Sequence, residues 1–249
     1  MNRKGIIISN PGELRAENYC EGVKKDVANY RSFLLSPNGG VWLESELEEM
    51  NRPSIAEVRR RIKSLRNYDY VLVVFSGHGY HCSIRDSSVL ELRAGEEIDS
   101  DEFRGKADKL TLILDCCRKV YPEKRTMVMD SARVAKRAPI LNPADCRKYY
   151  NRRIDECSNG IIVMHSCDID ELSGDDASRG GYYSHSLLEE GKRWARDSDT
   201  DTNGDFAIQS VVQAHNGASP RVQSLSGSSQ NPQIEKPRSS PYFPFCIVA

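Results

Sequence analysis

The chain has 249 residues, enough for one large domain, with 35 Lys and Arg residues against 36 Asp and Glu residues. The resulting net charge of −1 gives no electrostatic basis for general nucleic-acid binding. No apolar run approaches the ~18 residues that a membrane-spanning helix needs. We therefore expect neither nucleic acid nor a membrane as a partner.

Eight cysteines are spread along the whole chain. A domain of this size has no need of disulfides, so we interpret them as reduced thiols and expect a cytoplasmic location. The segment Met1–Lys4 leads straight into three isoleucines and lacks the apolar region and cleavage site of a secretory signal peptide.

Short apolar runs alternate with amphipathic segments along the chain. Runs typical of buried strands occur at residues 5–8, 41–43, 71–75, 110–114, 160–165 and 244–248. Apolar residues at helical spacing occur at residues 18–35, 53–65, 182–196 and 206–215. This alternation predicts an α/β fold with a mostly parallel sheet of about six strands.

Two segments interrupt the alternation. Residues 118–153 hold eleven basic and three acidic residues with little periodicity, which predicts a long loop. Residues 216–240 are rich in Ser, Gly, Pro and Gln, which predicts an exposed loop.

Reactive side chains follow two of the predicted strands. The run 71–75 leads into Ser76-Gly77-His78-Gly79, and the run 110–114 leads into Asp115-Cys116-Cys117. Neighbouring parallel strands deliver their carboxyl ends to one edge of the sheet, so His78 could meet one of the two cysteines there. A thiol beside an imidazole is the minimal apparatus for covalent peptide cleavage. The alternative is a strand-ending turn with an exposed histidine beside two small buried cysteines.

These two motifs resemble the His and Cys motifs of caspase-like cysteine peptidases. The Asp-x-Cys pattern is closer to the metacaspase branch, and above all to compact bacterial metacaspase-like proteases, than to animal caspases. Further similar segments occur in the expected order along the chain at residues 22–26, 166–175, 181–188, 231–233 and 243–245.

The resemblance implies a caspase-like three-layer α/β/α sandwich that forms one domain over residues 1–249. Residues 1–117 would be the large-subunit-like part and residues 159–249 the small-subunit-like part. Residues 118–158 would be a basic loop and a candidate processing region.

The resemblance also implies roles for individual residues. Cys117, two residues after Asp115, would be the nucleophile rather than Cys116. His78 would activate the thiol and protonate the leaving amine. The backbone N–H groups of Gly79 and Cys117 would form the oxyanion hole.

The specificity pocket of metacaspases maps onto Asp26, Ser76 and Asp115, with Asp175 as a further candidate. Two carboxylates in one pocket select a basic side chain, so the resemblance implies cleavage of protein or peptide substrates after Arg or Lys.

Charge patterning points to the same substrates. Residues 168–176 contain five acidic residues and no basic one, whereas the predicted loop is basic. An acidic rim at the active edge would attract basic substrates, and we expect self-processing after Arg125, Arg137 or Arg153. The alternative is that both charged segments are solvated surface.

Metal and cofactor signals are weak. Residues 199–205 resemble the first part of a calcium loop, but Ser210 stands where a bidentate Glu is needed. Residues 98–102 resemble part of the metacaspase calcium site, but Lys124 stands where another acidic ligand would fall, which argues against a need for calcium. We expect no required cofactor and assign no metal site.

The leading hypothesis is therefore a cysteine endopeptidase with a Cys–His dyad. The alternative is a catalytically silent caspase-like scaffold that acts by binding proteins. By analogy with bacterial members, the enzyme would serve as a cell-death or antiphage effector that cuts a pore-forming or other effector protein.

Overall fold

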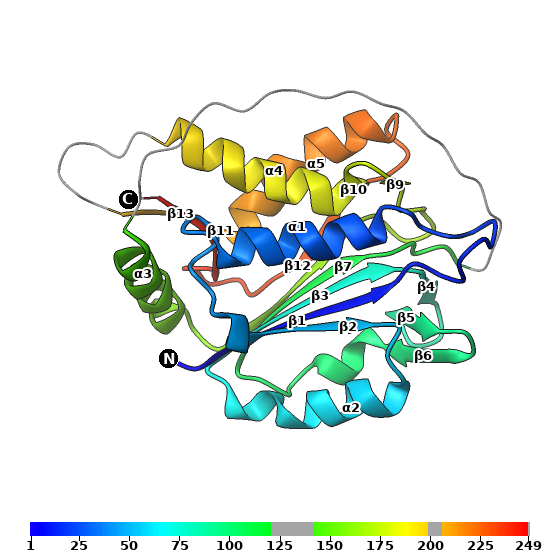
Figure 1. Ribbon diagram of the computed structural model, residues 1–249, viewed down its shortest axis with the longest axis horizontal. Helices are drawn as coiled ribbons and strands as arrows, with labels where there is room; N and C mark the ends of the chain where they lie inside the picture. The colour runs from blue at the N-terminus through cyan, green and yellow to red at the C-terminus, as the bar shows by residue number, and fades with distance from the viewer. Residues whose placement is uncertain (121–141, 199–205, 249) are drawn as a thin grey trace.

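A six-stranded sheet lies at the centre of the computed structural model, which describes residues 1–120, 142–198 and 206–248 (Figure 1). Its strands are β1 (Arg3–Asn10), β2 (Leu47–Asn51), β3 (Tyr70–Gly77), β7 (Lys109–Asp115), β8 (Gly160–His165) and β12 (Gln233–Glu235). The strand order is β12-β8-β7-β3-β1-β2, and only β12 runs antiparallel to its neighbour. The prediction of a mostly parallel sheet of about six strands is confirmed.

Helices cover both faces of this sheet, which confirms the three-layer α/β/α sandwich. They are α1 (Val23–Leu35), α2 (Ile55–Ser64), α3 (Pro143–Glu156), α4 (Tyr182–Asp197) and α5 (Val211–Leu225), with short 3₁₀ turns η1 (Glu44–Glu46), η2 (Leu65–Asn67) and η3 (Ser100–Phe103). In Figure 1, α1, α4 and α5 lie above the sheet and α2 lies below it.

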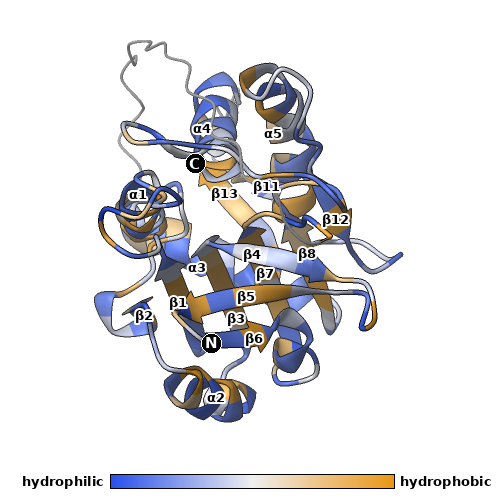
Figure 2. Ribbon diagram, turned by 90° about the vertical axis from the view of Figure 1, so that its right-hand side faces the viewer, coloured by the Kyte–Doolittle hydropathy of each residue, from blue (hydrophilic) through white to orange (hydrophobic). Residues whose placement is uncertain are grey.

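The isoleucine run of β1 shows how the sequence builds two cores. Ile7 packs into the hydrophobic cluster under α1 and α4, whereas Ile6 and Ile8 pack into the cluster on the opposite face with Val58 of α2. Successive side chains of a strand point to opposite faces, so a continuous apolar run is buried on both. Figure 2 shows the hydrophobic residues concentrated in the strands between the helical layers.

Three smaller sheets surround the central one. Strands β4 (Gly79–Cys82), β5 (Ser87–Arg93) and β6 (Glu96–Asp99) form an antiparallel sheet directly after the His78 turn. Strands β9 (Asp175–Asp176) and β10 (Gly180–Gly181) form a hairpin, and β11 (Ala207–Ser210) pairs with β13 (Pro244–Val248). None of the strands β4, β5, β6, β9, β10 and β11 was predicted from the sequence.

The final strand β13 lies outside the central sheet, and both of its edges are covered. One edge pairs with β11. On the other, the Ile247 N–H donates to the Asn38 carbonyl at 2.8 Å, and Asn38 Nδ2 donates to the Ile247 carbonyl at 3.0 Å. The outer edge of the central sheet on this side is instead β12, a strand of three residues.

The prediction of one long loop over residues 118–153 is wrong from residue 143 onward, because α3 occupies residues 143–156. Asn142 caps this helix by accepting from the Ala144 N–H at 3.1 Å, and Pro143 stands in its first turn. Its buried residues, Cys146, Tyr150 and Ile154, recur at every fourth position. This narrow apolar stripe is easily masked by the surrounding charges.

Other boundaries also differ from expectation. The first helix begins at Val23 rather than residue 18, and residues 41–43 form a turn into η1 rather than a strand. Residues 206–215 were expected to be a short helix but hold β11 and the start of α5. Because α5 runs to Leu225 and β12 follows, residues 216–240 are not one loop. No helix within the three described stretches is long and apolar enough to cross a lipid bilayer.

The packing of α3 gives a stability prediction. Ile154 is fully buried, whereas Ile84 at the β4–β5 turn is 95% exposed. We expect Ile154→Ala to lower the free energy of unfolding by about 2–5 kcal/mol, because it leaves a cavity in the core. The same substitution at Ile84 should change it by less than about 0.5 kcal/mol. Urea unfolding of both variants is the measurement, and equal effects would show that α3 does not pack as described.

Candidate active site

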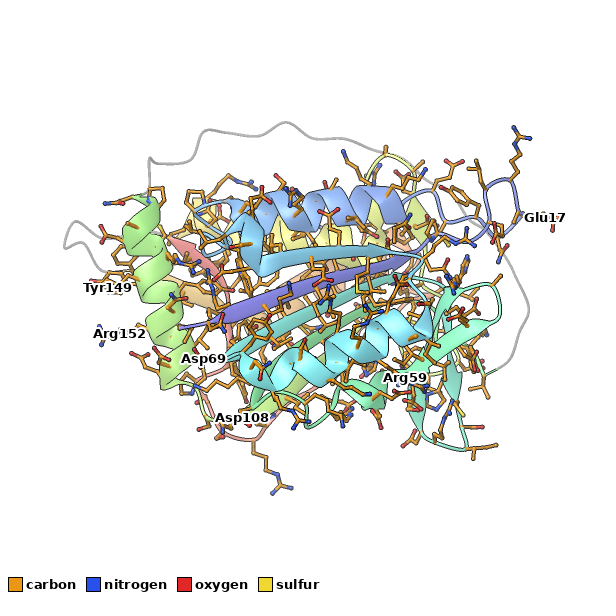
Figure 3. All side chains as sticks on the ribbon, turned by 60° about the horizontal axis from the view of Figure 1, so that its bottom comes forward. Glu17, Arg59, Asp69, Asp108, Tyr149 and Arg152 are labelled. Atoms are coloured by element: carbon orange, nitrogen blue, oxygen red, sulfur yellow. The ribbon has the colours of Figure 1, made fainter. Side chains whose placement is uncertain are left out.

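The two predicted motifs reach the same edge of the sheet. Strands β3 and β7 pair in parallel, with Ser76 opposite Asp115. His78 directly follows the end of β3, and Cys117 lies two residues after the end of β7. Figure 3 shows the opposite edge marked by Asp69 and Asp108, which precede these strands, whereas Glu17 of the loop after β1 extends from the far end. The expected convergence of the strand ends is present.

Gly77 makes the turn to His78 sterically possible. Its φ of +149° is unfavourable for residues with a side chain, and a Cβ at this position would lie 2.3 Å from the Asn10 carbonyl oxygen. The following Gly79 lies close to the cysteine segment, because a Cβ at this position would be 2.9 Å from Cys116 Sγ. Glycine on both sides of His78 therefore lets the histidine loop pack against the end of β7.

The two adjacent cysteines occupy different environments. Cys116 is 2% exposed and belongs to the core cluster on the α2 side, where burial raises the pKa of its thiol well above the ordinary value. Cys117 is less buried, and its sulfur accepts the Ser173 N–H at 3.3 Å. Burial raises the pKa of Cys117 as well, but the Ser173 N–H counteracts this by favouring the thiolate. Of the two thiols, Cys117 is thus the more accessible one and the one whose sulfur receives a backbone donor.

Cys20, which the sequence analysis did not select, lies against His78. Its sulfur is 3.7 Å from Nε2 and 3.9 Å from Nδ1 of the imidazole. Burial, followed by the charge of Asp175, raises the pKa of Cys20 to about 12, so this side chain is a neutral thiol at physiological pH. The available signal was topological, because the loop after β1 must reach the same sheet edge as the loops after β3 and β7.

The predicted pocket residues lie together in the interior. Asp26, in the first turn of α1, accepts from Ser76 Oγ at 2.6 Å and from the Gly181 N–H at 2.9 Å. Asp115 accepts from Ser173 Oγ at 2.7 Å and from the Ser184 N–H at 2.9 Å. The structure therefore brings Asp26, Ser76 and Asp115 to one place from three elements.

Both carboxylates are buried without a cation. Asp26 is 1% exposed and Asp115 is 5% exposed, and within the described stretches neither pairs with a lysine or arginine. Burial and the neighbouring Asp115 raise the pKa of Asp26 well above its ordinary value. Burial and the charge of Asp175 raise the pKa of Asp115 in the same direction. Burial therefore disfavours the charged form of both acids, and the hydroxyl and N–H donors around them in the described stretches offset part of this cost.

The start of α4 covers the two carboxylates. A Cβ on Gly180 would lie 2.0 Å from Asp26 Oδ1, and a Cβ on Gly181 would lie 2.4 Å from Asp115 Oδ2. Bare glycine backbone therefore forms the wall above the acids, and any larger residue would displace them. A cavity of about 440 Å³ lies elsewhere, between β2 and α2, and none of these residues lines it.

Asp175, the further pocket candidate, lies beside the start of α1. Its Oδ2 accepts the Gly22 N–H at 2.8 Å, which joins the β9 hairpin to the start of α1. Burial raises the pKa of Asp175, and the charge of His78 acts in the opposite direction. Asp175 is thus within electrostatic reach of both the histidine and the pocket.

The metal signals gain no support. Ser210 caps α5 by accepting the Gln213 N–H, and residues 199–205 and Lys124 lie outside the described residues. Asp99 and Asp101 are engaged by Arg85 and Arg104, respectively. Among the residues that the structure describes, no three His, Cys, Asp or Glu side chains are grouped so that they could hold a metal ion.

A mostly parallel α/β/α sandwich with a thiol and an imidazole at one strand edge is the arrangement that the resemblance to caspase-like proteins implies. The chain belongs to the caspase domain family, whose model matches residues 2–243. It is similar to the crystal structure of caspase-1 from Spodoptera frugiperda, with a TM-score of 0.57 and 12% sequence identity over 94% of this chain and 86% of that chain. At this identity the likeness concerns the fold alone. No curated protein matches the chain in sequence.

The glycine wall gives a second prediction. Gly180 has a φ of +107° and Gly95 has a φ of +74°, but a Cβ at Gly95 would meet nothing within 4 Å. Alanine at either position should suffer the same kind of backbone strain, and only Gly180→Ala should also displace Asp26. We expect Gly180→Ala to be less stable than Gly95→Ala by about 1–3 kcal/mol in chemical unfolding. Similar values would contradict the close approach of the wall to Asp26.

Proposed function

We propose that the protein is a cysteine endopeptidase that cleaves after Arg or Lys. The Cys117 thiolate attacks the substrate carbonyl, and the backbone N–H groups of Gly79 and Cys117 receive the oxyanion. His78 takes the thiol proton and passes it to the leaving amine, and a water molecule then hydrolyses the thioester with His78 as base. The convergence of the His78 and Cys117 loops beside two carboxylates supports this proposal most strongly.

The preference for a basic side chain rests on the charge of the buried acids. A guanidinium or ammonium group between Asp26 and Asp115 would replace neutral donors by an opposite charge in a place shielded from water. Arg would fit best, because its planar fork can serve two carboxylates at once. Asp175 would add to the attraction. The glycine wall of β10 has to shift for such a side chain to enter.

Self-processing belongs to the same proposal. Arg125 and Arg137 lie outside the described residues, whereas Arg153 lies in the last turn of α3, where an extended cleavage conformation would require the helix to unwind. The helix therefore disfavours cleavage after Arg153, and Arg125 and Arg137 stay as the candidate cleavage positions. A bacterial cell-death or antiphage role, with a pore-forming or other effector protein as substrate, rests on the family resemblance alone.

Small fluorogenic peptides that end in Arg, Lys or Asp test the activity. We expect turnover of the Arg and Lys peptides, loss of turnover in Cys117→Ala and His78→Ala, and retention of most of it in the matched variant Cys116→Ala. Turnover of the Asp peptide alone would contradict the pocket assignment. Failure to turn over any peptide, with and without calcium, would favour the catalytically silent scaffold.

Asp26→Asn tests the pocket charge in both stability and activity. A carboxyl with a raised pKa in the folded state gives up its proton more readily when unfolded, so stability falls as pH rises from the ordinary carboxyl pKa toward the raised value. Asn can accept the Gly181 N–H and donate to Ser76, so in a pH series of thermal unfolding the variant should lose the part of this fall that Asp26 contributes. The part from Asp115, whose pKa is also raised, should remain.

The same variant should lose at least about 2 kcal/mol of recognition of an Arg peptide, or about 30-fold in kcat/KM. The matched control is Asp108→Asn, an exposed aspartate at the opposite end of the sheet (Figure 3). Equal effects of the two substitutions on kcat/KM would remove Asp26 from substrate recognition.

A further inference from the structure

Gln230 is a fully buried glutamine between α5 and β12, with 0% exposure. Its Nε2 donates to the Ser166 carbonyl at 2.9 Å and to Ser173 Oγ at 3.1 Å, and its Oε1 accepts the Gly174 N–H at 3.0 Å. All three contacts fall in the segment that follows β8. The side-chain amide of Gln230 thus both donates and accepts hydrogen bonds. These bonds fix the orientation of the amide and of the segment that follows β8.

Ser173, which Gln230 holds, contacts both Cys117 and Asp115. Its N–H donates to Cys117 Sγ at 3.3 Å, and its hydroxyl donates to Asp115 Oδ1 at 2.7 Å. The Cys117 thiol lies 3.8 Å from the Ser173 carbonyl as well. A shift of Ser173 would therefore move a donor away from the nucleophile and another away from the pocket acid.

Gln230 is itself fixed from the helical layer. Its backbone N–H donates to Ser226 Oγ at 3.1 Å, and Ser226 caps the C-terminus of α5. The neighbouring Asn231 is held by Glu171, whose Oε2 accepts the Asn231 N–H at 2.7 Å. The end of α5 and the segment after β8 are thus joined at several points, with Gln230 nearest the site.

We propose that Gln230 is a positioning residue that holds Ser173 against the nucleophile Cys117 and the pocket residue Asp115. The inference rests on the proposed peptidase function. It assigns a role in the site to a residue distant in sequence from both motifs. Gln230 acts through Ser173 and has no contact of its own with the reacting atoms.

Gln230→Met tests this role, because Met has a similar length and no hydrogen-bonding amide. The matched control is Gln233→Met, which makes the same change at an exposed position of β12. We expect Gln230→Met to lower kcat/KM for an Arg peptide by about tenfold or more, because misplacement of a reacting group is costly. The control should stay within about twofold of the wild type.

A second readout needs no peptide substrate. Iodoacetamide alkylates the thiolate, so the rate of Cys117 alkylation across a pH series reports the fraction of Cys117 that is ionised. Tandem mass spectrometry separates its product from that of Cys116. The Ser173 N–H favours the Cys117 thiolate, so its displacement should raise the pKa of Cys117 further. The alkylation midpoint of Gln230→Met should therefore move to higher pH, and that of Gln233→Met should not.

A third readout separates positioning from general destabilisation. Gln230→Asn keeps a buried amide but withdraws it by one methylene group, and it should shift the alkylation midpoint in the same direction if Gln230→Met does not fold. In a Ser173→Ala background, Gln230→Met should lower kcat/KM by less than it does alone. Gln230 reaches Asp115 only through the Ser173 hydroxyl, which the background variant has already removed.

The proposal is overturned if a folded Gln230 variant keeps the wild-type alkylation midpoint, even when its melting temperature or its activity falls. That result would make Gln230 a structural residue only. If the wild-type protein cleaves no peptide, the proposed function fails by itself, and the alkylation midpoint still decides whether Gln230 positions Ser173 beside Cys117.

Discussion

Two buried carboxylates that pair with no lysine or arginine of the described stretches are the constraint on which the architecture of this site depends. Asp26 and Asp115 come from α1 and β7, and both are held by the first backbone N–H groups of α4. A helix N-terminus favours negative charge, so α4 partly offsets the cost of burying the two acids. These hydrogen bonds also hold the start of α4 directly against the two carboxylates. Such a close approach requires glycine at residues 180 and 181. A pair of like charges in such a place weakens the free protein and suits a cationic ligand.

The sheet was predictable because its strands carry a strong local signal. Strand β8 begins and ends where the sequence predicts, and β3 and β7 extend the predicted runs by one or two residues at each end. Such continuous apolar runs have few alternatives to a strand covered on both faces. Helix α3 was missed because charged residues outnumber its three buried ones. The short strands β4 and β6 were missed because they contain few apolar residues and depend on tertiary pairing.

The candidate site was predictable to the same extent as its local motifs. His78, Cys117, Ser76 and Asp115 all stand at strand ends, where chain topology brings them together. Cys20 and Gln230 carry no comparable signal. Each is an isolated polar residue whose partners come from a distant part of the chain, His78 for the first and Ser173 for the second. Their importance follows from packing, and no sequence period or spacing marks it.

The proposed chemistry places opposite electrostatic demands on this small region. A cysteine peptidase needs a thiolate, but burial, and after it the charges of Asp115 and Asp175, raise the pKa of Cys117. On the proposed function, the charges suited to binding a basic substrate therefore disfavour the thiolate of Cys117. A guanidinium bound between Asp26 and Asp115 would cancel part of this field and lower the cost of forming the thiolate. On the proposed function, a basic substrate side chain in the pocket would thus both hold the substrate and favour the Cys117 thiolate. Without it the thiol would react slowly.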